Sequence, residues 1–265
     1  MPEGHTLHRL ALDLNEAFQG RTLAVSSPQG RFAESAAELD GTVLVDSTAH
    51  GKHLFCEFEH DVFLHVHLGL IGKFRIGRPI PPRGAVRVRF ETPEAVGDLR
   101  GPILCVLKTP PEIAAQIADL GPDPLRADAD PQLAWRRISA SRRSIAALLM
   151  DQRILSGVGN VYRAEVLFRN RIDPHRPGNE LRRRSWNAIW ADLLELMPQG
   201  VLDQRINTVR DEHLPQLLAG QGRRSGRNYV YRRAQLPCWV CGTPVQTEVL
   251  AGRNLFWCSR CQRRG

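Results

Sequence analysis

Residues 238–261 read Cys-Trp-Val-Cys-Gly-Thr-Pro-Val-Gln-Thr-Glu-Val-Leu-Ala-Gly-Arg-Asn-Leu-Phe-Trp-Cys-Ser-Arg-Cys, so that two Cys-x2-Cys pairs are separated by sixteen residues. This spacing is typical of a four-cysteine tetrahedral zinc site. Because four thiolates leave no open position for water, we expect one structural Zn²⁺. The predicted ligands are Cys238, Cys241, Cys258 and Cys261.

The segment between the two cysteine pairs has the pattern of a β-hairpin. Residues 244–250 and 255–257 are its expected strands, and residues 251–254 its expected turn. So small a hairpin has almost no core of its own, and zinc is therefore expected to supply much of its folding free energy. An arginine at a hairpin tip is usually only solvated, but Arg253 on a rigid hairpin of a basic protein is a good phosphate ligand.

Further towards the N-terminus, Ser156-Gly157-Val158-Gly159-Asn160 separates two helical patterns. Glycine allows a positive φ and close backbone approach, while Asn160 is expected to cap the next helix and to leave its N–H groups facing an anion. A tight turn between packed helices would need the same glycines. In a basic protein, however, a helix–turn–helix commonly holds a DNA backbone. Helical patterns cover residues 131–138, 144–151, 160–170 and 179–197.

Turn-forming residues are dense over residues 120–131, and the residue types change there from strand-like to helix-like. We expect a domain boundary at this point. Before it, residues 6–18 have the apolar face of a helix. Short alternating or β-branched runs follow and predict a β-sandwich or flattened barrel, with strands at 42–45, 54–58, 62–68, 86–90 and 103–107.

Two loops of the N-terminal half are possible functional sites. Lys52 precedes a predicted strand, where a lysine is usually an exposed edge residue, although it could also serve chemistry. Leu70 and Ile71 lie in a loop bracketed by glycines. Such apolar side chains can belong to the core, but on a turn they could also wedge into a base stack.

The formal net charge of +8 and the pI near 9.7 favour a polyanionic partner, because phosphates bind fields of basic side chains. Only three residues are lysines, so few side-chain amines are available for chemistry. The chain has neither a long apolar run nor the pattern of a secretory signal, which indicates a cytosolic protein. Cys56 and Cys105 lie singly in apolar surroundings and are expected to be buried thiols.

The first three residues, Met1-Pro2-Glu3, suggest a catalytic site. If Met1 is removed, Pro2 carries a secondary amine whose pKa is about 8, so that part of it is unprotonated and nucleophilic at neutral pH. Such an amine can attack a sugar aldehyde carbon to form an iminium, and Glu3 can move the protons that ring opening requires. The alternative is an ordinary surface terminus.

Taken together, these motifs resemble the Fpg/Nei family of DNA glycosylases. The resemblance rests on Met1-Pro2-Glu3-Gly4, Gly51-Lys52, the segment Ser-Gly-Val-Gly-Asn-Val-Tyr-Arg-Ala-Glu at 156–165 and the cysteine hairpin, and it covers nearly the whole chain. Within this family, the chain is most similar to the endonuclease VIII (Nei) branch of actinobacterial type, because of its opening residues Met-Pro-Glu-Gly-His-Thr-Leu.

This resemblance implies an α+β fold whose DNA lies in a cleft between the halves. The expected parts are a helix-flanked β-sandwich over residues 1–120, a linker over 121–134, a helix-two-turn-helix domain over 135–232 and a zinc finger over 233–265. No catalytic metal or redox cofactor is expected. The implied enzyme is a monomeric, cytoplasmic and nucleoid-associated DNA N-glycosylase and AP lyase.

The resemblance also implies roles for single residues. Pro2 would be the Schiff-base nucleophile, Glu3 the general acid/base and Lys52 a catalytic lysine that contacts DNA. Asn160 and Arg253 would hold the phosphates that flank the flipped nucleotide. The loop that fills the vacated stack would present Leu70 and Ile71.

One position departs from the family pattern. Members commonly have a second glutamate at the sixth position, where this chain has Thr6. This difference places in question a proton-transfer or damage-recognition role there, but leaves Pro2 and Glu3 unaffected.

We expect excision mainly of oxidised pyrimidines from double-stranded DNA, followed by β- and δ-elimination. Two alternatives remain: the same chemistry on oxidised purines such as formamidopyrimidines and 8-oxoguanine, and a zinc-finger protein that binds damaged DNA without chemistry.

Overall fold

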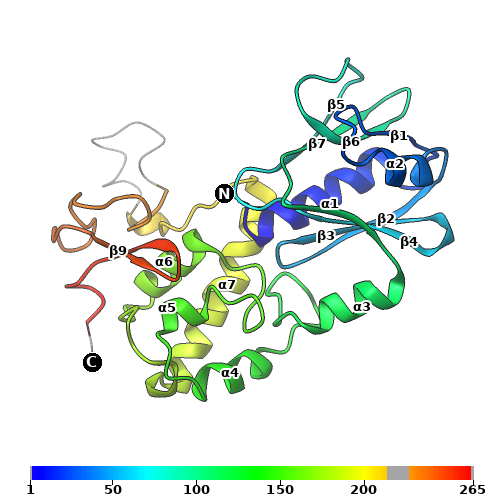
Figure 1. Ribbon diagram of the computed structural model, residues 1–265. Helices are drawn as coiled ribbons and strands as arrows, with labels where there is room; N and C mark the ends of the chain where they lie inside the picture. Colours follow the sequence, from blue (N-terminus) through cyan, green and yellow to red (C-terminus); the bar gives the residue numbers. More distant parts are fainter. Residues whose placement is uncertain (1, 214–226, 264–265) are drawn as a thin grey trace. The chain divides into compact units, whose positions relative to one another are not determined.

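The computed structural model describes residues 2–213 and 227–263. The chain divides into two compact units, Met1–Asp119 and Leu120–Gly265 (Figure 1). Each unit has its own buried hydrophobic cluster, so each side chain discussed below is positioned by the unit that contains it.

The first unit contains two antiparallel four-stranded sheets and three α-helices. The strand orders are β1-β6-β7-β5 and β2-β3-β4-β8. The elements are α1 (Gly4–Phe18), β1 (Ala24–Ser26), α2 (Ala33–Leu39), β2 (Leu44–His50), β3 (His53–Phe58), η1 (Glu59–Asp61), β4 (Val62–His67), β5 (Lys73–Gly77), β6 (Val86–Glu91), β7 (Val96–Arg100), β8 (Leu104–Lys108) and α3 (Pro110–Ala118).

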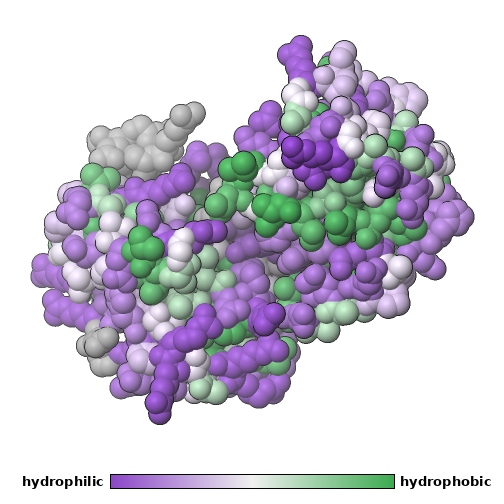
Figure 2. Space-filling model, in the orientation of Figure 1, coloured by the Kyte–Doolittle hydropathy of each residue, from purple (hydrophilic) through white to green (hydrophobic). Residues whose placement is uncertain are grey.

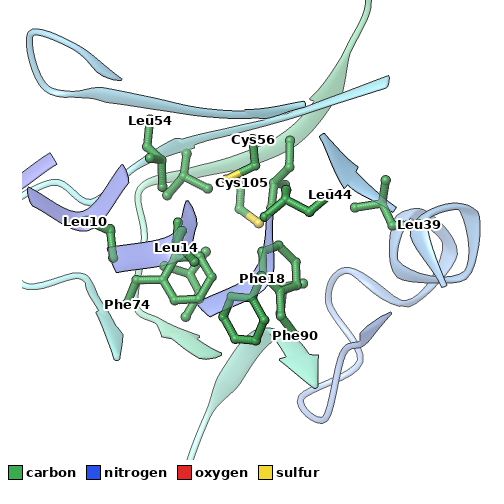
Figure 3. Close-up of a cluster of buried hydrophobic side chains, with 14 of the residues drawn as sticks. Leu10, Leu14, Phe18, Leu39, Leu44, Leu54, Cys56, Phe74, Phe90 and Cys105 are labelled. Carbon is green, nitrogen blue, oxygen red and sulfur yellow. The ribbon is translucent and has the colours of Figure 1, made fainter. Parts of the chain in front are cut away.

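Helix α1 joins the two sheets through its apolar face. Figure 3 shows Leu10, Leu14 and Phe18 among side chains from both sheets. The Phe18 and Phe90 rings meet edge-to-face, with centroids 6.1 Å apart. Because burial of one large apolar side chain stabilises the folded state by about 1.5–3 kcal/mol, this face fixes the helix firmly against the sheets.

Cys56 and Cys105 are buried in the same cluster. Burial raises the pKa of each thiol to about 12, so both remain protonated at neutral pH. The prediction that they are buried core thiols is confirmed.

Most predicted elements of the first unit are present, with two kinds of correction. The strand expected over residues 42–45 is wrong in its bounds, since β2 runs from Leu44 to His50 and Val43 makes only an isolated bridge to Thr22. Three strands and two helices were not predicted: β1, β5, β7, α2 and α3. The missed strands are short, and β5 and β7 alternate core residues with charged ones.

The second unit is helical, with one hairpin. Its elements are α4 (Pro131–Ser139), α5 (Ile145–Leu148), α6 (Asn160–Arg169), η2 (Gly178–Glu180), α7 (Arg183–Asp203), η3 (Asp211–His213), β9 (Gln246–Leu250) and β10 (Arg253–Trp257). Asp130 caps α4 by accepting the N–H of Gln132 (2.8 Å), and Pro131 fits its first turn. Helix therefore begins within residues 121–134, where a linker was expected.

A buried carboxylate connects α6 to the segment that precedes the hairpin. Glu165 accepts the backbone N–H groups of Tyr229 (2.7 Å), Val230 (2.9 Å) and Tyr231 (2.8 Å). It also accepts the hydroxyl of Thr208. These four donors satisfy a carboxylate that is fully buried, and they fix the backbone of residues 229–231 against the helix.

The surface is largely hydrophilic on the face that Figure 2 shows. Among the described residues, no helix is long and apolar enough to cross a membrane.

Candidate active site and nucleic-acid interface

Glu3, the residue directly before α1, has a fixed position. Glu3 is the N-cap residue of α1 in an extended conformation, and its carbonyl accepts the N–H of Thr6 at 2.8 Å. Its side chain makes no capping bond and is completely buried, while Pro2 is half-buried. The carboxyl group of Glu3 therefore lies in a protected environment directly after the proline.

Two polar side chains align α1 antiparallel to β2. Asn15 donates from Nδ2 to Asp46 Oδ1 (2.7 Å) and to the carbonyl of Ser47 (3.1 Å). One helical turn later, Gln19 Nε2 donates to the carbonyl of Val45 (3.1 Å). Residues nearer the start of α1 therefore lie beside residues nearer the end of β2.

This alignment indicates where α1 begins. A helix rises about 1.5 Å and a strand about 3.4 Å per residue, so the segment from Asn15 back to Gly4 spans ~16 Å, or about five strand residues. Five residues beyond Ser47 is Lys52. The start of α1 therefore lies beside the turn between β2 and β3.

Lys52 occupies this turn together with Gly51, whose φ is 59°. The lysine is half-buried, and it lies in the turn and not within a strand. Burial is the main cause that lowers the pKa values of His53 and His67, and the charge of Lys52 lowers both further.

Three histidines lie side by side across this end of the sheet. The strand register pairs His50 with His53 and His53 with His67. Two residues further along, His65 pairs with Phe55, and its Nε2 is 2.8 Å from His53 Nδ1. Burial is the main cause that lowers the pKa of His53 to about 3 and that of His65 to about 4, so both rings are neutral at pH 7.

The loop between β4 and β5 carries an exposed apolar tip. Leu70 is 50% exposed and Ile71 79% exposed, so neither belongs to the core. Ile103, the residue before β8, is 71% exposed and lies against this loop, where a Cβ on Gly69 would be 2.5 Å from its Cγ2. The loop is further fixed by the N–H of Gly69, which donates to His67 Nδ1 (3.0 Å).

In the second unit, Asn160 has a different position from the expected one. The N-cap of α6 is Gly159, and Asn160 is the first helical residue, so the predicted capping role is wrong. Asn160 Nδ2 donates to the carbonyl of Asn254 (2.9 Å), and its Oδ1 accepts from Arg163. Arg163 is fully buried and also donates to Asn254 O (3.4 Å).

These bonds attach the start of α6 to β10 directly beside Arg253. The predicted turn over residues 251–254 is too long, because β10 begins at Arg253 and pairs with Leu250. Only Ala251 and Gly252 form the turn, with φ of 51° and 70° as a type I′ hairpin turn requires. Arg253 is therefore a half-buried strand residue, and Asn160 and Arg253 are brought together within one unit.

The four predicted zinc ligands converge in the same unit. Their sulfur atoms all lie within 4.8 Å of one another, with 3.4 Å between Cys241 and Cys258 and 3.9 Å between Cys238 and Cys261. Tetrahedral zinc with Zn–S bonds of about 2.3 Å needs sulfur atoms about 3.8 Å apart. The donor set and its spacing fit a structural Zn²⁺.

Two neighbours fix the cysteine loops. Gln262 accepts the N–H of Cys258 (2.9 Å) and donates to the carbonyl of Ile172 (2.9 Å). The guanidinium of Arg233 lies 3.7 Å from the ring centroid of Trp239. The hairpin is also less isolated than its sequence indicates, because Leu255 and Phe256 are buried in the clusters of the helical unit.

Comparisons with known proteins agree along the whole chain. Residues 1–100 match the formamidopyrimidine-DNA glycosylase N-terminal domain, residues 120–211 the formamidopyrimidine-DNA glycosylase H2TH domain and residues 235–264 the zinc finger found in FPG and IleRS. The chain belongs to the Fpg/Nei family of DNA glycosylases. The prediction of a DNA N-glycosylase and AP lyase of base excision repair, with one structural zinc, is confirmed at the level of this family.

Relatives from both branches of the Fpg/Nei family are similar. Endonuclease 8 1 of Mycobacterium tuberculosis is 51% identical over 99% of this chain and 100% of its own length. Formamidopyrimidine-DNA glycosylase of Thermus thermophilus is 33% identical over 100% and 98%, respectively. The predicted likeness to actinobacterial endonuclease VIII is confirmed by the mycobacterial relative.

The predicted α+β fold is confirmed as an Fpg-like fold. A crystal structure of Lactococcus lactis Fpg with DNA containing an abasic site matches with a TM-score of 0.83, covering 99% of this chain and 100% of that one at 21% identity.

Several residues of this Fpg/Nei chain that the structure brings into view were not predicted from sequence. They are His53 and His67 beside Lys52, Ile103 beside the apolar tip, and Arg163 and Asn254 beside Arg253. Ile103 had a usable signal, since Gly101-Pro102 precedes this apolar residue directly before a strand. His53 directly follows Lys52 in the sequence. By contrast, His67, Arg163 and Asn254 depend on pairings between distant segments.

Thr6, the departure from the Fpg/Nei pattern, lies in the first turn of α1 and is half-buried. Its hydroxyl is 3.3 Å from His5 Nε2. Burial is the main cause that lowers the pKa of His5 to about 4. A neutral imidazole and a hydroxyl, and no second carboxylate, therefore accompany Glu3 in this turn.

Proposed function

We propose that this enzyme removes oxidised bases, mainly pyrimidines, from double-stranded DNA through a Schiff base on Pro2, and that it then cleaves the strand. The observation that carries the proposal is the buried carboxylate of Glu3, which follows Pro2 directly at a helix start aligned with the Lys52 turn. A general acid/base beside an amine in a dry setting is what imine chemistry requires.

The first stage forms the covalent intermediate. Once Met1 is removed, the lone pair of the Pro2 nitrogen attacks C1′ of the damaged nucleoside. The N-glycosidic bond breaks, its electron pair leaves with the base, and the base takes up the proton that the Pro2 nitrogen releases after attack. Glu3 in its acid form protonates the ring oxygen O4′ as the C1′–O4′ bond opens, which leaves an iminium between Pro2 and C1′.

The second stage cleaves the strand. The iminium acidifies the C2′ proton, and its removal drives electrons into a C2′–C3′ double bond while the 3′ phosphate departs. Loss of a C4′ proton then expels the 5′ phosphate in the δ-elimination. Hydrolysis of the remaining imine regenerates the free amine of Pro2.

Cationic and polar groups hold the DNA during these steps. Lys52 contacts the strand near the nucleophile and assists catalysis, while Asn160 and Arg253 bind the phosphates beside the flipped nucleotide. Asn160 retains a second amide N–H besides the one it gives to Asn254. Leu70 and Ile71 are exposed enough to occupy the space that the extruded base leaves.

Oxidised pyrimidines are the favoured substrates because of the 51% identity to Endonuclease 8 1 over the whole chain. Oxidised purines are a second possibility, since a formamidopyrimidine-DNA glycosylase is 33% identical. A panel of duplexes that each contain thymine glycol, dihydrouracil or 8-oxoguanine separates the two. Faster single-turnover excision of the pyrimidines supports the proposal, and faster excision of 8-oxoguanine contradicts the preference.

Glu3→Gln tests the chemistry apart from the fold. Loss of general acid/base catalysis should slow excision by about 10²–10⁴-fold, while affinity for a duplex with a tetrahydrofuran abasic analogue stays within about twofold. The isosteric Asn160→Asp variant is the matched contrast, because it should weaken binding to that duplex. A Glu3→Gln enzyme with wild-type excision rates would remove Glu3 from the mechanism.

A further inference from the structure

A cavity of about 660 Å³ lies on the first unit, over β5, β7 and the loop of residues 78–85. Its lining includes five basic side chains and one carboxylate, Asp98. The basic residues are Lys73, Arg75, Arg78, Arg83 and Arg100. None of them has a role in the chemistry proposed above.

The cavity is on the face of the sheet that turns away from the core. Side chains alternate along a strand, and Phe74 and Leu99 point into the core. The strand register pairs Lys73 with Arg100 and Arg75 with Asp98 on the opposite face. The charged residues therefore form one continuous surface.

Asp98 does not neutralise this surface. The buried Arg89 donates to Asp98 Oδ1 (3.1 Å), and Arg100 donates to its Oδ2 (2.8 Å). Its single negative charge is thus shared by two arginines. In the part of the chain that the structure describes, no ion pair involves Lys73, Arg75, Arg78 or Arg83.

The same two arginines fix the loop that forms one wall. Arg89 donates to the carbonyl of Ile80, and Arg100 Nε donates to the carbonyl of Arg83 (3.0 Å). Arg78 and Arg83 are thereby carried on an anchored backbone. Ile80 and Pro81, from the same loop, add apolar lining.

The cavity begins directly behind the apolar tip. β5 starts two residues after Ile71, and β7 ends three residues before Ile103. A five-residue strand spans about 17 Å, and each strand of a duplex carries one phosphate per ~3.4 Å of helix axis. If the tip enters the duplex at the lesion, the cavity is within reach of phosphates up to about five nucleotides away.

We propose that this cavity is a second DNA-binding site, which takes a backbone phosphate of the duplex a few nucleotides from the lesion. Arg78 and Arg83 contact the phosphate oxygens, and the adjoining sugar lies on Ile80 and Pro81. Because Asp98 is already paired with two arginines, the lining offers a DNA strand phosphate donors and apolar surface, and the contact is independent of base sequence. The inference rests on the proposed function for the position of the lesion.

The test compares charge reversals in equilibrium binding to a duplex with a tetrahydrofuran lesion, which cannot form the Schiff base. Arg78→Glu and Arg83→Glu are compared with Arg31→Glu, an exposed arginine of the same unit outside the cavity. One duplex has twelve base pairs on each side of the lesion. The other has two on each side and is closed by hairpin loops.

On the long duplex, we expect the cavity variants to bind about tenfold more weakly than wild type, with a salt slope smaller by about one. On the short duplex, their affinity should match that of Arg31→Glu. Equal affinity of all three variants for the long duplex would overturn the proposal. The basic side chains of the cavity would then be only solvated. The proposal would also fail if inorganic phosphate or thymidine monophosphate bound tightly at the cavity while the cavity variants kept the DNA affinity of wild type.

Borohydride trapping of the same variants on an abasic duplex separates the two proposals. If wild type forms no adduct but the affinity pattern holds, the Schiff-base mechanism fails and the second DNA site stands. If adducts form normally and the affinity pattern is absent, only the second site fails.

Discussion

The start of α1 and the hairpin β9–β10 hold their functional groups by different physical means. α1 is fixed by a buried apolar face that reaches two sheets, and it presents Pro2 and Glu3 at its end. The hairpin exposes most of β9 and is fixed by four cysteines and by Leu255 and Phe256. The position of the α1 start thus depends on a large hydrophobic core. The position of the hairpin depends on a bound metal and on two side chains that are buried in the helical unit.

This difference implies that the two regions fail independently. Loss of core packing should release the start of α1 and leave the cysteine site intact, whereas loss of zinc should do the reverse. The chain has built-in reporters for both cases. Cys56 and Cys105 are buried in the first unit, and all five tryptophans lie in the second.

Removal of zinc should have the largest effect. Structural zinc supplies about 10–16 kcal/mol in zinc-finger peptides, so a strong chelator should expose Cys238, Cys241, Cys258 and Cys261 to a thiol-labelling pulse. Cys56 and Cys105 should stay protected, and peptide mass spectrometry distinguishes the two sets. DNA affinity should fall about tenfold to hundredfold as Arg253 loses its fixed position.

Unchanged DNA binding after verified zinc loss would show that the metal does not position Arg253. Arg253→Ala is the matched variant, because it removes the guanidinium while the cysteines remain protected.

Leu14→Ala should weaken the other region. Leu14 is fully buried on α1, and truncation of a buried leucine costs about 2–5 kcal/mol of unfolding free energy. In urea, labelling of Cys56 and Cys105 should shift to lower concentrations, while tryptophan fluorescence follows the wild-type curve. A common shift of both signals would mean that the two units unfold as one.

Acid should also destabilise the first unit. Burial lowers the pKa values of His5 and His65 to about 4 and that of His53 to about 3, so the folded state resists protonation that the unfolded chain accepts near pH 6.5. The stability that each neutral, buried histidine contributes is fully present above pH 6.5. As the pH falls from 6.5 towards 4, the free energy of unfolding decreases by up to about 1.4 kcal/mol per pH unit for each histidine.

The measurement is urea unfolding between pH 7 and 5, followed by labelling of Cys56 with an acid-tolerant disulfide reagent. His65→Phe should flatten the pH dependence relative to wild type. An unchanged slope in that variant would contradict the assignment of a neutral, buried His65.

Ile103→Ala should have the smallest effect, because it trims an exposed side chain. If Ile103 supports the Leu70–Ile71 tip in DNA, excision from a duplex should slow by about threefold to tenfold, as for the loss of a few methylene groups. Cleavage of a single-stranded abasic substrate should not change, since no stack has to be filled. Equal slowing on both substrates would argue against insertion.

The sequence was informative where one residue or a short motif carries the chemistry. The four cysteines and the hairpin between them followed from the cysteine spacing, and Pro2, Glu3 and Lys52 could be proposed as site residues from short motifs. The turn of that hairpin was placed too broadly, because Arg253 in a strand and Arg253 in a turn have the same local sequence. Only the pairing with Leu250 distinguishes them.

Features made by pairing of distant segments were not accessible in this way. β5 and β7 lack β-branched runs, since charged residues cover their outer face, and this same feature creates the basic cavity. The capping role given to Asn160 failed because its side chain bonds to Asn254, about ninety residues later. By contrast, α3 had a recognisable capping box in Thr109 and Glu112, so that omission was avoidable.

The most direct test of the central claim is the site of the covalent adduct. The protein with Met1 removed is incubated with an abasic duplex and borohydride, and the trapped complex is digested and mapped by mass spectrometry. We expect one adduct, on the nitrogen of Pro2, and none in Pro2→Gly or in protein that retains Met1. An adduct on Lys52, or equal trapping by Pro2→Gly, would contradict the central claim.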